Sequence, residues 1–291
     1  MKIVNILGGL GNQMFEYAMY LALKNAHPQE NIKVCTRSFG GYGLHNGLEI
    51  QRIFGVELPE ASLRDLCKVA YPFFNYSTWR VMRHWLPVRK SMASGTTQIP
   101  FTFEEVTRED SVYYDGYWQN EGNFKHIREN ILLAYSFPEF LDDKNYYLAE
   151  RLKTANAVSC HVRRGDYLKE SEMCVCTSSY YARAITEMNE RVNPDLYVVF
   201  SDDIQWCIDN LSGLIGKREV VFVDWNKKEN SYRDMQLMSL CKHNIIANSS
   251  FSWWGAWLNQ FKGKIVIAPE AWMNKSLVND PICKDWIRIK Q

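Results

Sequence analysis

No apolar stretch of this sequence is long enough to cross a membrane. A transmembrane helix needs about 20 consecutive apolar residues, whereas the first apolar run, residues 3–7, is short and leads directly into glycines. We therefore expect neither a membrane span nor a signal peptide. The chain also lacks an excess of charge of one sign, because its formal net charge is +1. We expect no nucleic-acid partner, since binding to nucleic acid calls for a broad basic surface.

Several signatures of common enzymes are missing as well. The chain has no H-E-x-x-H, no G-x-S-x-G and no G-x-x-x-x-G-K-[ST], so zinc-protease, esterase and P-loop functions are not indicated. The metal-binding motif Asp-x-Asp does not occur either. The eight cysteines are scattered, and Cys174-Val175-Cys176 has neither a second pair nor nearby histidines. We expect reduced, buried thiols, a cytoplasmic location and no metal site.

The apolar runs that are present predict an α/β fold with two domains, for which 291 residues suffice. A strand, a glycine turn, a helix and a second strand form a βαβ unit at the N-terminus. The elements expected in the first half are strands at 2–7, 31–36 and 111–118, helices at 14–25, 49–85 (broken at Pro59 and Pro72), 124–133 and up to 154, and an irregular segment at 90–100.

The second half alternates between strands and helices. Its Val- and Ile-rich runs predict a parallel sheet covered by helices on both faces. The expected strands are 157–163, 196–201, 219–224, 244–247 and 264–268, and the expected helices are 178–193, 204–211, 231–241 and 252–261. We place the domain boundary between about residues 138 and 156, which gives domains of residues 1–150 and 151–291.

The glycine turn at residues 8–13 invites a dinucleotide-binding interpretation, which the sequence contradicts. The pattern G-x-G-x-x-G starting at Gly9 would need a glycine where Met14 stands, and the second strand ends in Thr36-Arg37 with no acid to hold a ribose. Two interpretations of the glycines remain open. They either let a ligand approach the backbone closely or let the helix pack on the strand.

The stretch His161-Val-Arg-Arg-Gly-Asp-Tyr167 places two arginines where a strand ends, which is where open α/β sheets bind ligands. Neighbouring side chains on a strand point to opposite faces. One of Arg163 and Arg164 can therefore bind an anion such as a phosphate, while the other pins the loop to Asp166. The alternative is a purely structural strand end, with Arg164 paired to Asp166.

Two further polar stretches follow strands of the same domain. Asp202 either caps the next helix or binds a sugar hydroxyl, and capping is the favoured alternative. Ser249 and Ser250 begin a helix whose free N–H groups form an anion site, unless the serines serve as plain caps. The tryptophans that follow them are expected to pack in the core; they are Trp253, Trp254 and Trp257.

Three motifs resemble those of the α-1,2-fucosyltransferases of glycosyltransferase family 11. They are Gly8-Gly-Leu-Gly-Asn-Gln-Met-Phe-Glu-Tyr-Ala18, the arginine stretch 161–167, and Asn248-Ser-Ser-Phe-Ser-Trp-Trp-Gly-Ala-Trp-Leu258. A fourth segment, 116–124, is similar to the family's Gly-Tyr-Phe-Gln-Ser. Glu16 departs from the family, which usually has Gln there. The resemblance implies a GT-B-like fold, with two Rossmann-like domains facing a cleft. It also implies inverting transfer of L-fucose from GDP-fucose to the 2-hydroxyl of a β-galactoside, without metal or other cofactor.

The resemblance also implies roles for residues. Arg163 is expected to hold the diphosphate, His161 to lie near the guanosine, and Asp234 to accept hydrogen bonds from guanine. The donor-binding set expected in the C-terminal domain is His161, Arg163, Arg164, Asp166, Asp202, Asp234, Ser249, Ser250, Phe251 and Ser252. The N-terminal domain is expected to bind the acceptor through Gly9, Gly11, Asn12, Gln13, Tyr117, Trp118 and Gln119. Arg163 and Asn12 are the expected catalytic residues, and no base is assigned.

Two alternatives stay open. The first alternative to the α-1,2 activity is a fucosyltransferase of another linkage, because specificity lies in the less readable N-terminal half. The second is a non-catalytic nucleotide-sugar or glycan-binding protein. Animal members carry a membrane anchor that is absent from this sequence, which resembles a soluble bacterial-type member. Peripheral attachment to the inner face of a membrane, for a lipid-linked glycan acceptor, is compatible with this. The oligomeric state and the acceptor beyond a β-galactoside are not indicated.

Overall fold

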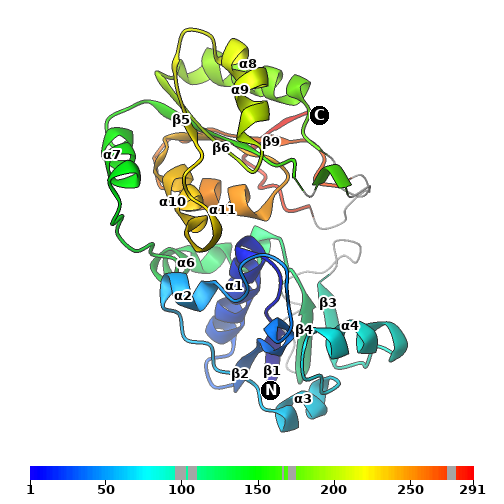
Figure 1. Ribbon diagram of the computed structural model, residues 1–291. Coiled ribbons are helices and arrows are strands. Elements are labelled where there is room, and N and C mark those ends of the chain that lie inside the picture. Colours follow the sequence, from blue (N-terminus) through cyan, green and yellow to red (C-terminus); the bar gives the residue numbers. More distant parts are fainter. Residues whose placement is uncertain (96–102, 104–109, 166, 170–174, 274–279) are drawn as a thin grey trace. The chain divides into compact units, whose positions relative to one another are not determined.

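The computed structural model describes residues 1–291 except 96–102, 104–109, 166, 170–174 and 274–279 (Figure 1). The described chain divides into two compact units. Unit 1 is Met1–Pro138 with Asp280 and Pro281, and unit 2 is the remainder from Glu139 on. The division falls after Pro138, at the start of the expected boundary region, because helix α7 (Asp143–Leu152) packs on helix α10 (Tyr232–Leu240) of unit 2.

Unit 1 contains a four-stranded parallel sheet in the order β2-β1-β4-β3. Its strands are β1 (Lys2–Asn5), β2 (Ile32–Cys35), β3 (Met92–Gly95) and β4 (Val112–Gly116). Its helices are α1 (Leu10–Ala26), α2 (Ile50–Phe54), α3 (Leu63–Val69), α4 (Tyr76–Trp85) and α6 (Arg128–Ala134), with 3-10 turns η1 (Arg37–Phe39), η2 (Glu121–Asn123) and η3 (Lys125–Ile127). The prediction of an irregular segment at 90–100 was wrong for β3, a short edge strand that only pairing with β4 reveals.

Helix α1 begins at Leu10, whereas the sequence predicted its start at Met14. Glycine, asparagine and glutamine are weak signals for a helix interior, so the first turn was assigned to the glycine loop. In the structure the side chain of Gln13 is fully buried and bonded to the backbone, so tertiary contacts stabilise this turn. The glycine motif is therefore the start of the helix itself.

Unit 2 contains a six-stranded parallel sheet in the order β10-β9-β8-β5-β6-β7. The strands are β5 (Ala157–Val162), β6 (Leu196–Ser201), β7 (Glu219–Val223), β8 (His243–Ile245), β9 (Val266–Pro269) and β10 (Ile287–Ile289). The helices besides α7 and α10 are α8 (Ser178–Val192), α9 (Ile204–Ile215) and α11 (Ser250–Leu258), and the 3-10 turns are η4 (Tyr167–Lys169) and η5 (Lys228–Asn230). The five predicted strands and the parallel sheet are confirmed, and β10 is an addition.

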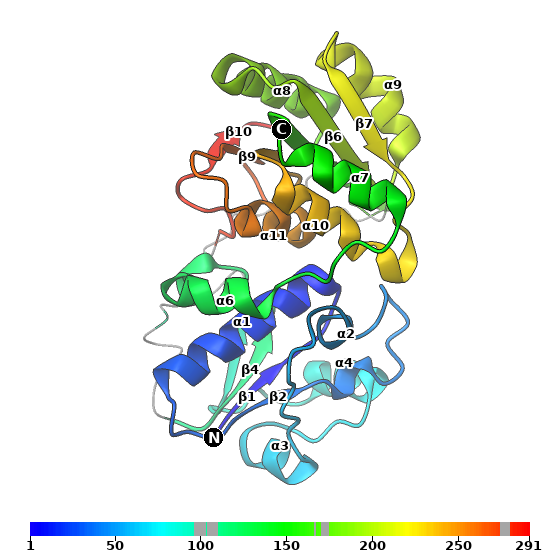
Figure 2. The ribbon, with the colours of Figure 1, turned by 90° about the vertical axis from the view of Figure 1, so that its left-hand side faces the viewer.

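The two faces of the unit 2 sheet are covered by different helices, as predicted. Helices α8 and α9 pack on one face and α7 and α10 on the other, so that each face buries its own apolar cluster (Figure 2). Helix α11 contains the three tryptophans, and all of them are buried, which confirms their core role. Gly255 lets α11 approach α10 closely, because a Cβ there would lie 2.8 Å from the Cβ of Met238.

The strand order of unit 2 contains one reversal point. The chain runs from β5 through β6 to β7 on one side, then returns to β8 on the other side of β5 and continues outward. Ligands of open α/β sheets bind beyond the carboxyl ends of the two strands that flank such a point. In this unit those ends are the stretches after Val162 and after Ile245. No helix in the described part of the chain is long and apolar enough to span a membrane.

Candidate functional site

The ends of strands β5 and β6 are joined through Asp202. Its Oδ1 accepts a hydrogen bond from the backbone N–H of Arg164 at 3.0 Å, and its Oδ2 lies 3.2 Å from Nη1 of Arg163. The prediction that Asp202 caps the next helix was wrong. The cap of α9 is Asp203, which accepts from the backbone N–H of Trp206 at 3.2 Å. Asp202 thus orients the arginine loop.

The two arginines differ in their surroundings. The guanidinium of Arg164 lies 4.2 Å from the ring centroid of Trp206, and its Nε donates to Oδ2 of Asp203 at 3.2 Å. Arg164 therefore pins the loop to α9, through Asp203; Asp166, the expected partner, lies outside the described residues. Arg163 contacts Asp202 and the ring of Tyr167, with 29% of its side chain exposed. Arg163 is the better placed of the two to meet a ligand.

Gly165 allows the loop to lie against the end of β6. A Cβ at this position would lie 2.7 Å from Oδ2 of Asp202, closer than real carbon–oxygen contacts allow. Any larger residue would displace either the loop or the carboxylate that holds Arg163. The glycine of the arginine motif is therefore required for the geometry of the site.

His161 lies at the reversal point of the sheet. Its side chain is buried, and its ring centroid is 5.9 Å from that of Phe251 at the start of α11. Burial and, to a smaller extent, the charge of Arg163 lower the pKa of His161 to about 3. Among the described residues its buried Nδ1 has no hydrogen-bond partner. The imidazole is thus neutral near pH 7, and it carries a buried polar atom close to the start of α11.

The amino terminus of α11 lies beside His161 at the reversal point of the sheet. Ser249 is its N-cap residue, but the Ser249 side chain accepts no hydrogen bond from the described helix, so the plain-capping alternative was wrong for it. Ser252 is fully buried, and its hydroxyl donates a hydrogen bond to the backbone carbonyl of Ser249 at 3.3 Å. Tyr167 donates from its hydroxyl to the carbonyl of Asn248 at 3.1 Å. That bond ties the arginine loop to the helix start.

Asp234 is held by a chain of buried amides. Its Oδ1 accepts from Nδ2 of Asn226 at 2.8 Å, and the amides of Asn226 and Asn145 bond each other reciprocally at 2.7 and 3.0 Å. Burial raises the pKa of Asp234 to about 7, although the bond from Asn226 acts in the opposite direction. The sequence did not reveal Asn145 and Asn226, because 81 positions separate them and neither stands in a motif.

In unit 1 the structure brings two of the expected site residues together. Asn12, in the first turn of α1, accepts at its Oδ1 a hydrogen bond from Nε2 of Gln119 at 2.8 Å. Gly8 adopts φ of +94°, and a Cβ there would meet the side chain of Asn12 at 3.0 Å. Gly9 is the N-cap of α1 and Gly11 is buried within the helix. Asn12 therefore stays at the surface of the turn, half-buried.

Two residues expected to face a ligand, Trp118 and Gln13, are buried and contact other parts of unit 1. Trp118 is 1% exposed and packs edge-to-face on Tyr114, whereas Tyr117 beside it is exposed. Gln13 donates from Nε2 to the carbonyls of Gly8 and Gly47, both at 2.8 Å, and accepts at Oε1 from the backbone of Glu49. Its amide thus fastens a distant loop to the helix start.

Replacing Gln13 with Ala should therefore mainly lower stability. The change leaves buried backbone groups without partners, at roughly 1–3 kcal/mol each, so we expect a loss of about 3 kcal/mol in unfolding free energy. Denaturant unfolding of the purified variant measures this. Asn12→Ala is the matched control on the next residue: it breaks one half-buried bond and should cost less than about 1 kcal/mol. Equal stability of Gln13→Ala and the parent would contradict the role assigned to this amide.

Unit 1 also contains a pocket between helix α4 and the strands β3 and β4. Its volume is about 120 Å³, and Trp79, Tyr71 and Arg83 line it together with Asp115. Oδ1 of Asp115 accepts from Nδ2 of Asn5 at 3.1 Å, and burial raises the pKa of this carboxyl above its usual range. An aromatic wall with one carboxylate and one guanidinium suits a polar ligand with apolar faces, such as a sugar ring.

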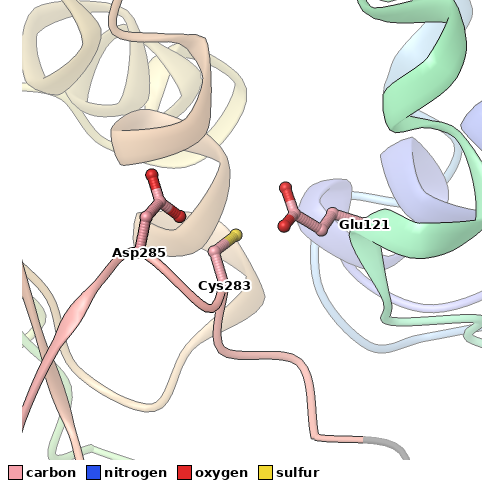
Figure 3. Close-up of side chains that lie close together, drawn as sticks. All are labelled: Glu121, Cys283 and Asp285. Atoms are coloured by element: carbon pink, nitrogen blue, oxygen red, sulfur yellow. The ribbon is translucent and has the colours of Figure 1, made fainter.

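The side chains of one cysteine and two acids are of the kinds that can share a metal ion. They are Cys283 and Asp285, from the segment before β10, and Glu121 of η2 (Figure 3). Cys283 and Asp285 belong to unit 2, whereas Glu121 belongs to unit 1. Neither unit alone supplies three ligands from this group, so we assign no metal site to it. The described cysteines are free, and all except Cys67 are buried.

Unit 2 thus has the features of a nucleotide-binding Rossmann-like unit, with an arginine and a helix start at the reversal point of its sheet. Known proteins with similar sequences are glycosyltransferases. Residues 85–290 match the model of Glycosyl transferase family 11. The chain is 33% identical to the α-1,2-colitosyltransferase of Escherichia coli, across 99% of both chains. It is 24% identical to galactoside α-(1,2)-fucosyltransferase 2 of Mus musculus, across 88% of this chain and 67% of that protein.

A solved structure shows the same fold. The fucosyltransferase NodZ from Bradyrhizobium superposes with a TM-score of 0.50 at 14% identity, over 87% of this chain and 90% of that one. The protein therefore belongs to glycosyltransferase family 11, as its motifs predicted, and is a glycosyltransferase. The predicted GT-B-like fold class, with two Rossmann-like α/β units, is confirmed.

Proposed function

We propose that this glycosyltransferase transfers L-fucose from GDP-fucose to the 2-hydroxyl of a terminal β-galactoside, with inversion. The observation that carries the proposal is the joining of the arginine loop to the start of α11 by Tyr167 and by the His161–Phe251 contact. A departing diphosphate gains negative charge in the transition state. Arg163 and the backbone N–H groups at the start of α11 are donors of the kind that stabilises such charge.

The donor nucleotide is proposed from the chemistry of Asp234. A carboxylate can accept hydrogen bonds from N1–H and N2–H of guanine, and adenine lacks both donors. The amide chain through Asn226 holds one carboxylate oxygen, which leaves the carboxylate oriented for a base. His161, neutral and buried at the reversal point, is proposed to lie near the guanosine.

The acceptor is proposed to bind unit 1. The pocket of Asp115 and Trp79 is proposed to take the galactose ring, with the aromatic surfaces for its apolar face and the carboxylate for its hydroxyls. Asn12 and Gln119 are proposed to orient the acceptor or the fucose. Tyr117 is exposed in the same turn region and can contact the glycan.

A second donor is favoured by one observation, the 33% identity with an α-1,2-colitosyltransferase. Colitose is L-fucose without its 3-hydroxyl group, so a site for one sugar differs from a site for the other by few contacts. A site that hydrogen-bonds the 3-hydroxyl would discriminate strongly against colitose, whereas an apolar site would not discriminate against it.

The direct test is incubation of the protein with GDP-fucose, with and without lactose, followed by linkage assignment of any product by NMR. Parallel reactions with GDP-colitose decide between the two donors by the ratio of kcat/KM. A 2-linked fucosyl product supports the proposal. A product of another linkage, or binding of both substrates without turnover, would support one of the two alternatives left open by the sequence.

We also expect that chelation does not inhibit the reaction. The sequence has no Asp-x-Asp, and Arg163 with the helix start can neutralise a diphosphate without a metal ion. Initial rates measured before and after dialysis against EDTA should agree within experimental error. Loss of most activity, with recovery on addition of Mg²⁺ or Mn²⁺, would show that a metal takes part.

A further inference from the structure

Helix α4 of unit 1 exposes an apolar stripe on its outer face. Val81 and Trp85, four residues apart and so on one side of the helix, are 57% and 83% exposed. Phe74 before the helix and Val88 after it are 64% and 74% exposed. Isolated exposed apolar residues are ordinary, but four within fifteen residues concentrate apolar surface in one segment, and such concentrations usually mark an interaction surface.

The inner face of α4 is fixed, so the exposure of the stripe does not result from a poorly formed helix. Asn75 and Thr78 form a capping box at its start, with bonds of 3.0 and 3.1 Å between side chain and backbone. The ring of Trp79 stacks on that of Tyr76, and the guanidinium of Arg83 lies 4.4 Å from the Trp79 ring centroid. Figure 1 shows α4 beside β3, the edge strand of this sheet.

The charged residues within the segment that carries the stripe all have one sign. Between Asp65 and Glu104 the sequence contains no acidic residue. The same segment contains several basic ones, namely Lys68, Arg80, Arg83, His84, Arg89 and Lys90. Because the whole chain has a formal net charge of only +1, this segment concentrates positive charge at one place. Acidic residues elsewhere balance it.

We propose that α4 and its flanks dock on the surface of an anionic phospholipid bilayer. A helix with tryptophan and aliphatic residues on one face and basic residues beside them is the pattern of interfacial helices, which insert the apolar face between lipid headgroups. The basic side chains meet the negative surface, while their aliphatic stems lie along the apolar boundary. The inference is independent of the donor and acceptor proposed above, since docking on lipid requires neither.

A second copy of the chain fits the surface less well. A stable dimer buries about 800 Å² on each partner, whereas a ten-residue helix is about 15 Å long and about 10 Å wide. Two copies of a patch without acidic residues would also repel each other. If the partner were an acidic protein, the purified chain would bind neither kind of vesicle, which is the first of the contrary outcomes below.

The test measures flotation of the purified protein with vesicles. The parent protein should float with vesicles that contain phosphatidylglycerol and much less with phosphatidylcholine vesicles, and added salt should weaken the binding. The double variant Val81→Ser/Trp85→Ser should lower the partition coefficient at least tenfold, which corresponds to about 1.4 kcal/mol. Arg80→Gln/Lys90→Gln should lower it by roughly thirtyfold, from about 1 kcal/mol for each of the two cations.

Matched controls come from outside the stripe. Leu133→Ser/Leu141→Ser removes two leucines that are 78% and 91% exposed, and Lys217→Gln/Lys262→Gln removes two exposed cations. Both controls should float like the parent. All variants should transfer sugar to a free, soluble acceptor at the parental rate and unfold at the parental temperature, which separates loss of docking from loss of folding or activity.

Three outcomes would overturn the proposal. The first is equal, weak flotation of the parent with both kinds of vesicle. The second is equal loss of flotation in the control variants. The third is a dimer in sedimentation equilibrium that Val81→Ser/Trp85→Ser dissociates, without any binding to lipid, because that result would identify the stripe as a contact between proteins.

Discussion

Replacing Arg163 with Lys should reduce kcat/KM at least 10²-fold, about 2.7 kcal/mol of transition-state stabilisation, and should lower the thermal midpoint by only a few degrees. Lysine keeps the positive charge but loses the planar fork, which fits a phosphate through two parallel hydrogen bonds. Arg163 is partly exposed and contacts Asp202 at 3.2 Å, an interaction that a lysine can largely replace. The loss should therefore appear in turnover rather than in stability.

Two other arginines provide the comparison. Arg164→Lys loses the stacking on Trp206 and the bond to Asp203, so it should lower stability more than Arg163→Lys and activity less. Arg191 forms an ion pair with Glu187 on the surface of α8, and Arg191→Lys should change neither quantity. Kinetics and thermal unfolding are measured on all three variants. A reversed pattern for Arg163 and Arg164 would exchange their roles, and full activity of both would remove the phosphate clamp from the mechanism.

The C-terminal half of the fold was predictable because its signals are local. Strands such as β5 and β6 are continuous apolar runs, and parallel strands buried on both faces require such runs. β3 and β10 escaped prediction because they are short edge strands, which are specified by pairing with β4 and β9 rather than by their own residues. The order of the six strands, and so the reversal point, is a property of tertiary packing that no local pattern contains.

In the candidate site, too, local motifs predicted some residues and only tertiary packing revealed the roles of others. The motifs and the family resemblance proposed Arg163, Asn12 and Asp234 as site residues, because their residue types and positions carry chemical meaning. They did not separate residues that face outward from residues that support them, since both kinds stand in the same motif. The side chain of Gln13 forms four hydrogen bonds with backbone groups, and the hydroxyl of Ser252 donates to the carbonyl of Ser249. Neither interaction follows from the spacing of residues in the motifs. The supporting amides at Asn145 and Asn226 lie outside every motif.

The affinity for GDP-fucose should increase with pH as Asp234 loses its proton. Burial raises the pKa of Asp234 to about 7, so the free protein holds a large neutral fraction below that pH. A neutral carboxyl is a poor acceptor for N1–H and N2–H of guanine, and a carboxylate is a strong one. Binding coupled to loss of one proton strengthens up to tenfold per pH unit below the pKa and levels off above it. Between pH 5.5 and 8 the expected gain is about thirtyfold.

Other titrating groups should contribute little to this profile. The pKa of His161 is lowered to about 3, so the imidazole stays neutral throughout the range. GDP-fucose is esterified at both ends of its diphosphate, which therefore does not titrate near neutral pH, and it is a better probe than GDP. The pH dependence measured by calorimetry can thus be assigned to Asp234.

Asp234→Asn provides the decisive comparison, since the amide keeps the bond to Asn226 within reach but does not titrate. At pH 8 the variant should bind GDP-fucose at least tenfold more weakly, because a charge-assisted bond contributes about 1.5–3 kcal/mol. Its affinity should be constant from pH 5.5 to 8, and its preference for GDP over ADP should decrease. A flat profile in the parent protein, or the same slope in parent and variant, would show that the guanine is bound by a different group. The amide chain through Asn226 and Asn145 would then hold Asp234 for the packing of α10 against α7 alone.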